Sequence, residues 1–193
     1  MRLAILNEGY GFRTKLLFSL IRLFSRQPVP DAARLSFYRP DFYGSYSKAL
    51  THEAMRGSSA WPVAERELMA AYVSSVNDCP FCIGAHSATA SLASRNEVMV
   101  TAVLNDLDSA PIDDGLRATL RMLGKLTRDG HLAAEDARAV FEKGVSRQQV
   151  EDALAICNVF NVTNRLANAF LFEILSPDGF RAGARYLLQR GYR

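Results

Sequence analysis

The segment Glu65–His86, with the sequence ERELMAAYVSSVNDCPFCIGAH, carries the most informative pattern in the chain. Its first half belongs to a predicted helix over residues 63–76, which Asn77-Asp78 interrupts. Proline is favoured at the first position of a helix, so Pro80 indicates a second helix over residues 80–94. Because the intervening turn is so short, the two helices are expected to pack side by side as a hairpin.

Helical periodicity extends over nearly the whole sequence. Ser146-Arg147-Gln148-Gln149 has the S-x-x-Q form of a capping box, and Ser176-Pro177 pairs an N-cap residue with a proline at the first helical position. No turn signal typical of a β-hairpin separates alternating strands. The sequence therefore predicts an all-α fold. Further helices are expected over residues 16–24, 43–55, 97–104, 114–128, 134–143, 148–173 and 178–189.

The N-terminal region differs from the rest in its prolines. Residues 28–40 contain prolines at positions 28, 30 and 40 and are predicted to form an extended linker. We therefore expect an N-terminal helix and Pro-rich extension over residues 1–40, followed by a helical domain over residues 41–193. The apolar face of the first helix is predicted to pack on its own domain or on a partner subunit, and a membrane-surface helix is the alternative.

The composition limits the class of protein. The chain has 193 residues, of which 49% are hydrophobic and 22% charged, as in ordinary globular proteins. A net charge of +3 without a dense Lys/Arg block argues against a nucleic-acid partner. The apolar run Leu16–Phe24 is too short to span a membrane and is not followed by a signal-peptide cleavage pattern. We expect a cytoplasmic protein in which a cysteine pair is normally reduced.

The cysteine pair lies at the predicted start of a helix, a position that favours ionised thiols. Cys79 is the expected N-cap and Cys82 lies in the first turn, where free backbone N–H groups and the helix dipole stabilise a thiolate. His86 follows Cys82 by four residues on the same helix face and can take the thiol proton. The N-cap position favours attack by Cys79, whereas the histidine favours Cys82, so spacing leaves the attacking sulfur open.

A carboxylate on the preceding helix extends this group. Glu67 shares a face with the small residues Ala71 and Ser74, where a partner helix can approach closely. We expect its carboxylate to orient the His86 ring in a proton relay. Glu65, near the start of the same helix, is expected to be solvated.

Other interpretations of these residues remain open. Cys79, Cys82 and His86 could supply three ligands of a zinc site, or the cysteines could be inert core residues and His86 a structural histidine. Cys157 lies among apolar residues and is predicted to be a core residue. We expect neither a metal nor a cofactor. Asn161 and Asn164 are expected to make polar contacts at a helix or subunit interface, with substrate contact as the alternative.

Glu67, Cys79-x-x-Cys82 and His86 together resemble the signature of the alkyl hydroperoxidase D / carboxymuconolactone decarboxylase superfamily. The stretch Phe160–Ala167, FNVTNRLA, resembles a late helix of its peroxidase-related members. The resemblance implies an all-α alkyl hydroperoxidase D-like helical bundle, with the Cys-x-x-Cys at the N-terminus of a central helix. It also implies a homo-oligomer: a dimer, trimer or hexamer.

The resemblance further implies a peroxidase cycle. Cys82 is then the thiol that attacks the hydroperoxide and becomes a sulfenic acid, Cys79 is the resolving thiol, and Glu67 and His86 form the relay. A dithiol donor, a lipoyl group or a thioredoxin-like protein, resets the disulfide. Phe81 stands where the best-studied hydroperoxidases have histidine. A redox adaptor or sensor with little turnover is the alternative function, and a helical oligomer with a structural cysteine pair is the third.

Overall fold

The computed structural model describes residues 3–192, which form helices and connecting loops without a β-strand. The helices are α1 (Ile5–Glu8), α2 (Phe12–Ser25), α3 (Asp31–Tyr38), the π-helical turn η1 (Pro40–Gly44), α4 (Ser45–Arg56), α5 (Val63–Val76), α6 (Pro80–Ser94), α7 (Glu97–Asn105), α8 (Asp114–Asp129), α9 (Ala134–Phe141), α10 (Arg147–Phe170) and α11 (Pro177–Arg190). The all-α prediction is confirmed.

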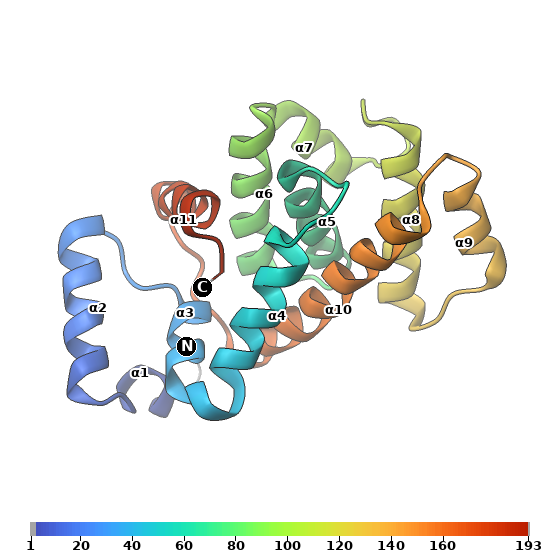
Figure 1. The fold of residues 1–193 in the computed structure, drawn as a ribbon. Helices are drawn as coiled ribbons and strands as arrows, with labels where there is room; N and C mark the ends of the chain where they lie inside the picture. The colour runs from blue at the N-terminus through green and yellow to red at the C-terminus, as the bar shows by residue number, and fades with distance from the viewer. Residues whose placement is uncertain (1–2, 193) are drawn as a thin grey trace.

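The hairpin of α5 and α6 lies at the centre of the bundle, with α11 beside α6 and the long α10 crossing α5 (Figure 1). Its turn is closed by Asp78, whose φ of 47° lies in the left-handed region that Asp tolerates better than most residues. The Cys79 N–H donates to the Ser74 carbonyl at 3.0 Å across this turn. The turn geometry therefore fixes where the cysteine segment enters α6.

The main core fills the space around α5. Its largest fully buried side chains come from α4, α5, α7, α8, α9 and α10: Met55, Leu68, Met69, Val73, Val100, Val103, Leu120, Leu123, Val140, Ile156 and Phe160. Removing such side chains from water is the main stabilising contribution, at about 25 cal/mol per Å² of apolar surface. Because α5 supplies three of them, one face of this helix is anchored in the core.

Most predicted boundaries are confirmed. The helices over residues 63–76 and 80–94 begin and end where the sequence indicates. Ser146 and Gln149 form the predicted capping box, with reciprocal hydrogen bonds of 3.2 and 3.0 Å. The Ser176 hydroxyl accepts from the Gly179 N–H at 3.1 Å, as expected for an N-cap.

The prediction of an extended linker over residues 28–40 is wrong, because α3 occupies Asp31–Tyr38. Pro30 is the N-cap residue of this helix and Pro40 follows its end, so the prolines bound a helix and do not interrupt one. The buried Asp31 carboxylate accepts from the Glu173 N–H at 2.9 Å and ties α3 to the segment after α10.

The end of α10 is also corrected. The sequence predicts a helix over residues 148–173, but α10 ends at Phe170 and Leu171 adopts a left-handed conformation with φ of 51°. The segment after Leu171 turns back, and Phe172 is buried. The apolar periodicity that continues past Phe170 therefore reflects burial of a loop, which a helical pattern does not distinguish.

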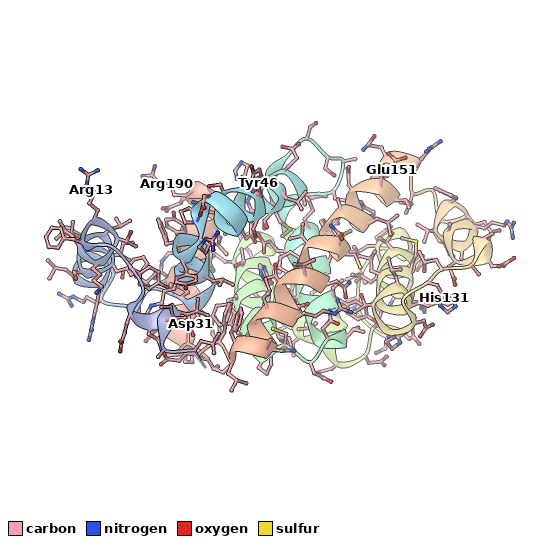
Figure 2. The ribbon with its side chains drawn as sticks, turned by 90° about the horizontal axis from the view of Figure 1, so that it is seen from below. Arg13, Asp31, Tyr46, His131, Glu151 and Arg190 are labelled. Carbon is pink, nitrogen blue, oxygen red and sulfur yellow. The ribbon has the colours of Figure 1, made fainter. Side chains whose placement is uncertain are left out.

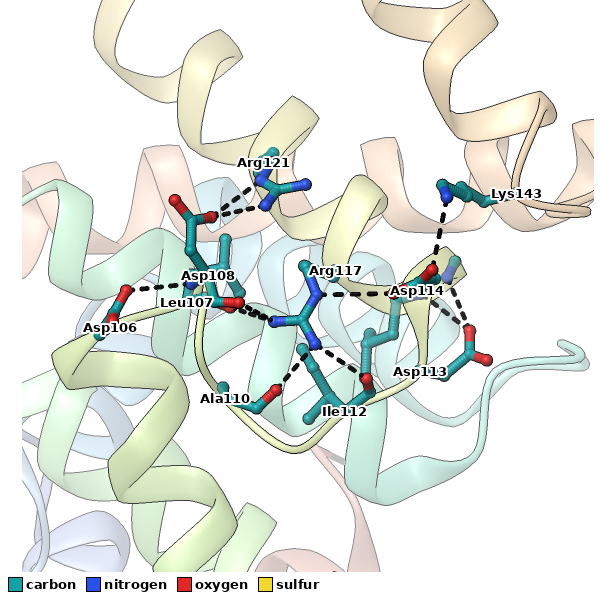
Figure 3. A network of polar contacts seen from close by, with 12 residues as sticks. Asp106, Leu107, Asp108, Ala110, Ile112, Asp113, Asp114, Arg117, Arg121 and Lys143 are labelled. Atoms are coloured by element: carbon teal, nitrogen blue, oxygen red, sulfur yellow. Dashed lines mark hydrogen bonds and ion pairs between the residues drawn. The ribbon is translucent and has the colours of Figure 1, made fainter.

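Arg117 holds the loop before α8 together (Figure 3). Its guanidinium donates to the carbonyl oxygens of Leu107, Asp108, Ala110 and Ile112, with the last two at 2.8 and 3.1 Å. A fixed fork of donors suits several carbonyl groups at once. This network positions α8 at the side of the bundle opposite the N-terminal helices.

Helix α2 makes few contacts with the bundle. Figure 2 shows Arg13 of this helix at one end of the molecule and His131 near the other. No residue of α2 is buried, and Phe12, Leu23 and Phe24 are 81%, 70% and 83% exposed. Among the described residues, no helix is long and apolar enough to cross a membrane.

Candidate functional site

The hairpin brings a glutamate and a histidine into contact. Glu67 on α5 and His86 on α6 are both buried, and a Glu67 carboxylate oxygen lies 2.8 Å from His86 Nδ1. The contact predicted from spacing is therefore present. Because Nδ1 is engaged by the carboxylate, Nε2 on the other side of the ring is left for proton exchange.

Two residues that the sequence reasoning missed complete the surroundings of Glu67. The Arg56 Nη2 lies 2.6 Å from Glu67 Oε1. The Tyr192 hydroxyl donates to the same carboxylate at 2.9 Å from Oε1, and lies 3.2 Å from Oε2. Arg56 ends α4, the helix before Glu67, and Tyr192 follows α11, so neither lies on the helix of Glu67 and no periodic pattern pointed to them.

These contacts keep Glu67 ionised although it is fully buried. Burial opposes the charged form, but the hydrogen bond and charge of His86 and the contacts with Arg56 outweigh it and hold the pKa of Glu67 below its usual value. A buried carboxylate with such partners is costly to leave unpaired, by about 3–5 kcal/mol when one partner is removed. Glu67 thus presents an ionised carboxylate to His86, with the Arg56 guanidinium as its other charged partner.

Aromatic rings hold the His86 imidazole in place. The Phe160 ring packs edge-on against it, with ring centroids 4.4 Å apart. The Tyr192 ring lies nearly parallel to it, with centroids 6.3 Å apart and an interplanar angle of 17°. Together with the Glu67 contact, these rings fix the orientation of His86.

The two cysteines are reduced and buried at the start of α6, with Cys79 as the residue before the first helical position. A hydrogen bond from the Cys82 thiol lowers the pKa of Cys79 to about 7, against the opposing effect of burial. The backbone amides of Cys82 and Phe81 and the Asn164 side chain lower it further. The same hydrogen bond, with burial, raises the pKa of Cys82.

Asn164 connects α10 to the hairpin. It is fully buried, donates to the Ser74 hydroxyl at 3.0 Å and accepts from the Asn77 side chain at 3.1 Å. Asn77 also donates to Asn161 at 3.2 Å. The expectation that Asn161 and Asn164 make polar contacts between helices is confirmed. Asn164 additionally stabilises the charged form of both thiols.

A shell of phenylalanine rings covers the cysteines. Phe81 packs edge-on against Phe172 with ring centroids 5.3 Å apart and lies 6.2 Å from the Phe180 ring. Gly84 permits the approach of Phe180, since a Cβ atom there would lie 2.5 Å from that ring. Leu35 of α3 packs against the same shell. Both cysteines are thereby closed to solvent, at 0% and 1% exposure.

Two other residues considered in the sequence, Cys157 and Glu65, do not contact the cysteine pair or His86 in any hydrogen bond or ion pair described above. Cys157 is buried in the main core, as predicted, next to Thr127 and Asn161. Glu65 is half-buried, and burial followed by the charge of Asp113 raises its pKa, so the expectation of a solvated Glu65 is corrected. In the part of the chain that the structure describes, no three His, Cys, Asp or Glu side chains are grouped as metal ligands.

The phenylalanine shell predicts how fast the cysteines react with reagents. Replacing Phe172 with alanine removes a ring that covers the pair and weakens the local packing by about 3–5 kcal/mol. Because buried thiols react through local opening, the Phe172→Ala variant should be alkylated by iodoacetamide at Cys79 at least about tenfold faster than the wild type. Mass spectrometry after timed quenching identifies the modified cysteine.

The matched control is Phe141→Ala on α9, where the ring is 45% exposed and belongs to a helix that does not contribute to the shell. Its alkylation rate should equal that of the wild type. Equal rates for Phe172→Ala and wild type would show that the shell does not limit access to the cysteines.

Three comparisons place the chain among known proteins. Residues 40–123 match the model of the carboxymuconolactone decarboxylase family. No curated protein sequence matches significantly. An uncharacterized peroxidase-related protein from Silicibacter sp. TM1040 has a similar structure, with a TM-score of 0.78, 23% identity and 93% of each chain covered.

A second similar structure is described as an alkylhydroperoxidase AhpD core, an uncharacterized peroxidase-related protein from Ralstonia eutropha JMP134. Its TM-score is 0.76 at 20% identity, over 91% of this chain and 92% of that one. At these identities the structural likeness shows the shared helical fold, and the family match adds the segment that contains Glu67, both cysteines and His86. Residues 40–123 thus match the carboxymuconolactone decarboxylase family, and the chain as a whole shares the helical fold of the two peroxidase-related structures.

Proposed function

We propose that this protein is a thiol-dependent peroxidase that reduces hydroperoxides by cycling Cys79 and Cys82 between a dithiol and a disulfide. The observation that carries the proposal is the buried contact of 2.8 Å between Glu67 and His86, on the hairpin that also holds the cysteine pair. A thiol with a lowered pKa at the start of the helix that also carries a positioned base is suited to proton-coupled thiol chemistry. The peroxidase-related names of the similar structures agree with it.

The reduced pair carries at most one negative charge near neutral pH, because the pKa of Cys79 is lowered to about 7 and that of Cys82 is raised. The lowered pKa of Cys79 places that charge on its sulfur at rest, with the Cys82 thiol as hydrogen-bond donor. Since the two sulfurs share one proton, its transfer from Cys82 to Cys79 moves the charge to Cys82 without adding a second one. The resting charge alone favours Cys79 as the attacking group, opposite to the order that the family resemblance implies.

The position of the relay supports attack by Cys82. The charge of Cys82 contributes to raising the pKa of Tyr192, so this sulfur lies within electrostatic reach of the Glu67 cluster. Cys82 also shares a helix face with His86. Attack on a peroxide releases an alkoxide that needs a proton, and the group that supplies it must lie near the attacking sulfur. We therefore assign attack to Cys82.

The chemistry balances in two steps. The Cys82 thiolate attacks one oxygen of the hydroperoxide, the O–O bond breaks, and Cys82 becomes a sulfenic acid while the alkoxide takes a proton from His86. Cys79, whose pKa of about 7 allows ionisation at neutral pH, then attacks the Cys82 sulfur and forms the disulfide. Its proton passes through His86 to the departing hydroxide, which leaves as water. His86 regains its proton from the pair when the two thiols are restored.

A dithiol donor completes the cycle by thiol–disulfide exchange and restores both thiols. We propose a lipoyl group or a thioredoxin-like protein for this step. The donor must reach a disulfide under the phenylalanine shell, so the shell has to open during reduction.

The second candidate function is a redox adaptor or sensor with little peroxidase turnover. Two observations favour it: both cysteines are closed to solvent, and Phe81 brings an apolar ring where the best-studied hydroperoxidases have histidine. In that role the pair exchanges with a protein partner and reacts only slowly with peroxides.

The peroxidase proposal predicts which cysteine variants lose turnover. With dihydrolipoamide or reduced thioredoxin as donor, Cys82→Ser should lower hydroperoxide consumption roughly a thousandfold or more, because the attacking sulfur is gone. Cys79→Ser should stop multiple turnover but keep one oxidation per chain, detected as a dimedone adduct on Cys82. Consumption is followed by a ferrous–xylenol orange assay.

Cys157→Ser is the matched control, since this cysteine is buried in the main core away from the pair, and it should turn over as the wild type does. Equal consumption by wild type and Cys82→Ser would contradict the peroxidase assignment. A dimedone adduct on Cys79 in the Cys82→Ser variant, with none on Cys82 in Cys79→Ser, would move the attacking role to Cys79. Slow consumption with fast donor exchange would indicate the adaptor.

We further propose that the chain forms a homo-oligomer through α2. The exposed apolar residues of this helix, Phe12, Leu16, Leu20, Leu23 and Phe24, recur at helical spacing, which is typical of an interface helix. Leu20→Asp combined with Leu23→Asp should lower the mass measured by light scattering to that of a smaller species, whereas Ser19→Asp on the same helix should not. A monomeric wild type at micromolar concentration would contradict this proposal.

A further inference from the structure

Tyr192 is the member of the Glu67 cluster that lies farthest from Glu67 in sequence. It contacts both oxygens of the Glu67 carboxylate. Its hydroxyl lies 2.9 and 3.2 Å from the two Glu67 oxygens and 3.4 Å from His86 Nδ1. Its ring stacks on His86 and lies under Arg56, with the guanidinium carbon 5.1 Å from the ring centroid. A single side chain thus contacts all three other members of the cluster.

The backbone at Gly191 and Tyr192 packs against His52 of α4. The Tyr192 N–H donates to His52 Nδ1 at 3.3 Å, which ties it to α4. Gly191 adopts a φ of 68°, and a Cβ atom there would lie 2.7 Å from the His52 ring. Only glycine fits this position without strain. The chain therefore turns sharply after α11 and brings the phenol into the buried cluster.

We propose that Tyr192 is a positioning residue whose hydroxyl holds the Glu67 carboxylate in the orientation that serves His86. This inference rests on the proposed peroxidase function and adds a fourth group to its relay. Tyr192 acts through Glu67 and does not itself touch the substrate.

The hydroxyl is suited to a permanent donor. Burial, followed by the charge of Glu67, raises the pKa of Tyr192 well above its usual value, so the phenol keeps its proton at neutral pH. A hydroxyl that stays protonated can hold the carboxylate by a hydrogen bond and does not take up the proton that His86 transfers. Arg56, which contacts one carboxylate oxygen, neutralises charge, whereas Tyr192 lies within hydrogen-bond distance of both oxygens and fixes their plane.

The Tyr192→Phe variant tests this, because it keeps the ring stacked on His86 and under Arg56 and removes only the hydroxyl. Without this donor the carboxylate loses stabilisation of its charged form, so the pKa of Glu67 should rise. We expect kcat for hydroperoxide to fall about tenfold with KM unchanged, the loss typical of one hydrogen bond to a charged group. The acidic limb of the pH profile of kcat should move to higher pH.

A second measurement does not depend on turnover. Because the folded-state pKa of Glu67 is depressed, its ionisation stabilises the fold above the unfolded-state pKa, and this stabilisation is lost as pH falls. Urea unfolding should therefore show a gap in stability between wild type and Tyr192→Phe that is largest near pH 7 and shrinks as the pH falls below 5. Tyr186→Phe, on a 55% exposed tyrosine of α11, is the control and should match the wild type throughout.

The outcomes separate the two proposals. If the wild type consumes no hydroperoxide and the stability gap still shrinks in acid, the peroxidase function fails while the hold of Tyr192 on Glu67 stands. If the wild type is active and Tyr192→Phe has the same kcat and pH profile, the inference on Tyr192 is overturned. A loss of kcat that is equal at every pH, with a stability gap that does not change with pH, also overturns it in favour of a packing role.

Discussion

The buried negative charge of Glu67 is the constraint on which the site depends. A carboxylate with no solvent exposure stays ionised only when cationic groups and hydrogen-bond donors surround it, and here His86, Arg56 and Tyr192 do so from three different helical segments. The charge therefore fixes the relative placement of α4, α6 and the segment after α11 around α5. The same contacts that hold these elements together orient the His86 imidazole on α6, the helix that follows Cys79 and contains Cys82.

A second set of contacts controls the protonation and the solvent access of the cysteine pair. The start of α6 and Asn164 stabilise a single negative charge shared by the two sulfurs, while the phenylalanine shell keeps water away from them. In the proposed cycle, this shared charge allows a pair with a low-pKa Cys79 to form a thiolate at Cys82, on the same helix face as His86. Asn164 of α10 thus helps to stabilise the thiolate, whereas Glu67 of α5 orients the His86 imidazole.

Much of this could be predicted from sequence, because it depends on local periodicity. The α5–α6 hairpin, the position of Cys79 before the first turn and the contact of Glu67 with His86 follow from helical spacing and a short turn. Arg56 and Tyr192 could not be found in this way, since their roles arise from packing between different helices: Arg56 lies on α4, across a loop from α5, and Tyr192 follows α11. The helix over Asp31–Tyr38 was missed because prolines bound a helix as readily as they mark a linker. The division into residues 1–40 and 41–193 stays a prediction, although α3 contributes Leu35 to the shell over the cysteines.

In the proposed cycle, the charge of Glu67 acts on the chemistry of the cysteine pair through His86. The most direct test is rapid mixing of reduced Glu67→Gln protein with a hydroperoxide, with disulfide formation followed by quenching and mass spectrometry and the fold checked by circular dichroism. Glutamine keeps the shape and loses the charge, so disulfide formation should slow by about a hundredfold or more in folded protein, the usual effect of disabling general acid–base catalysis. Disulfide formation at the wild-type rate in folded Glu67→Gln would contradict the account.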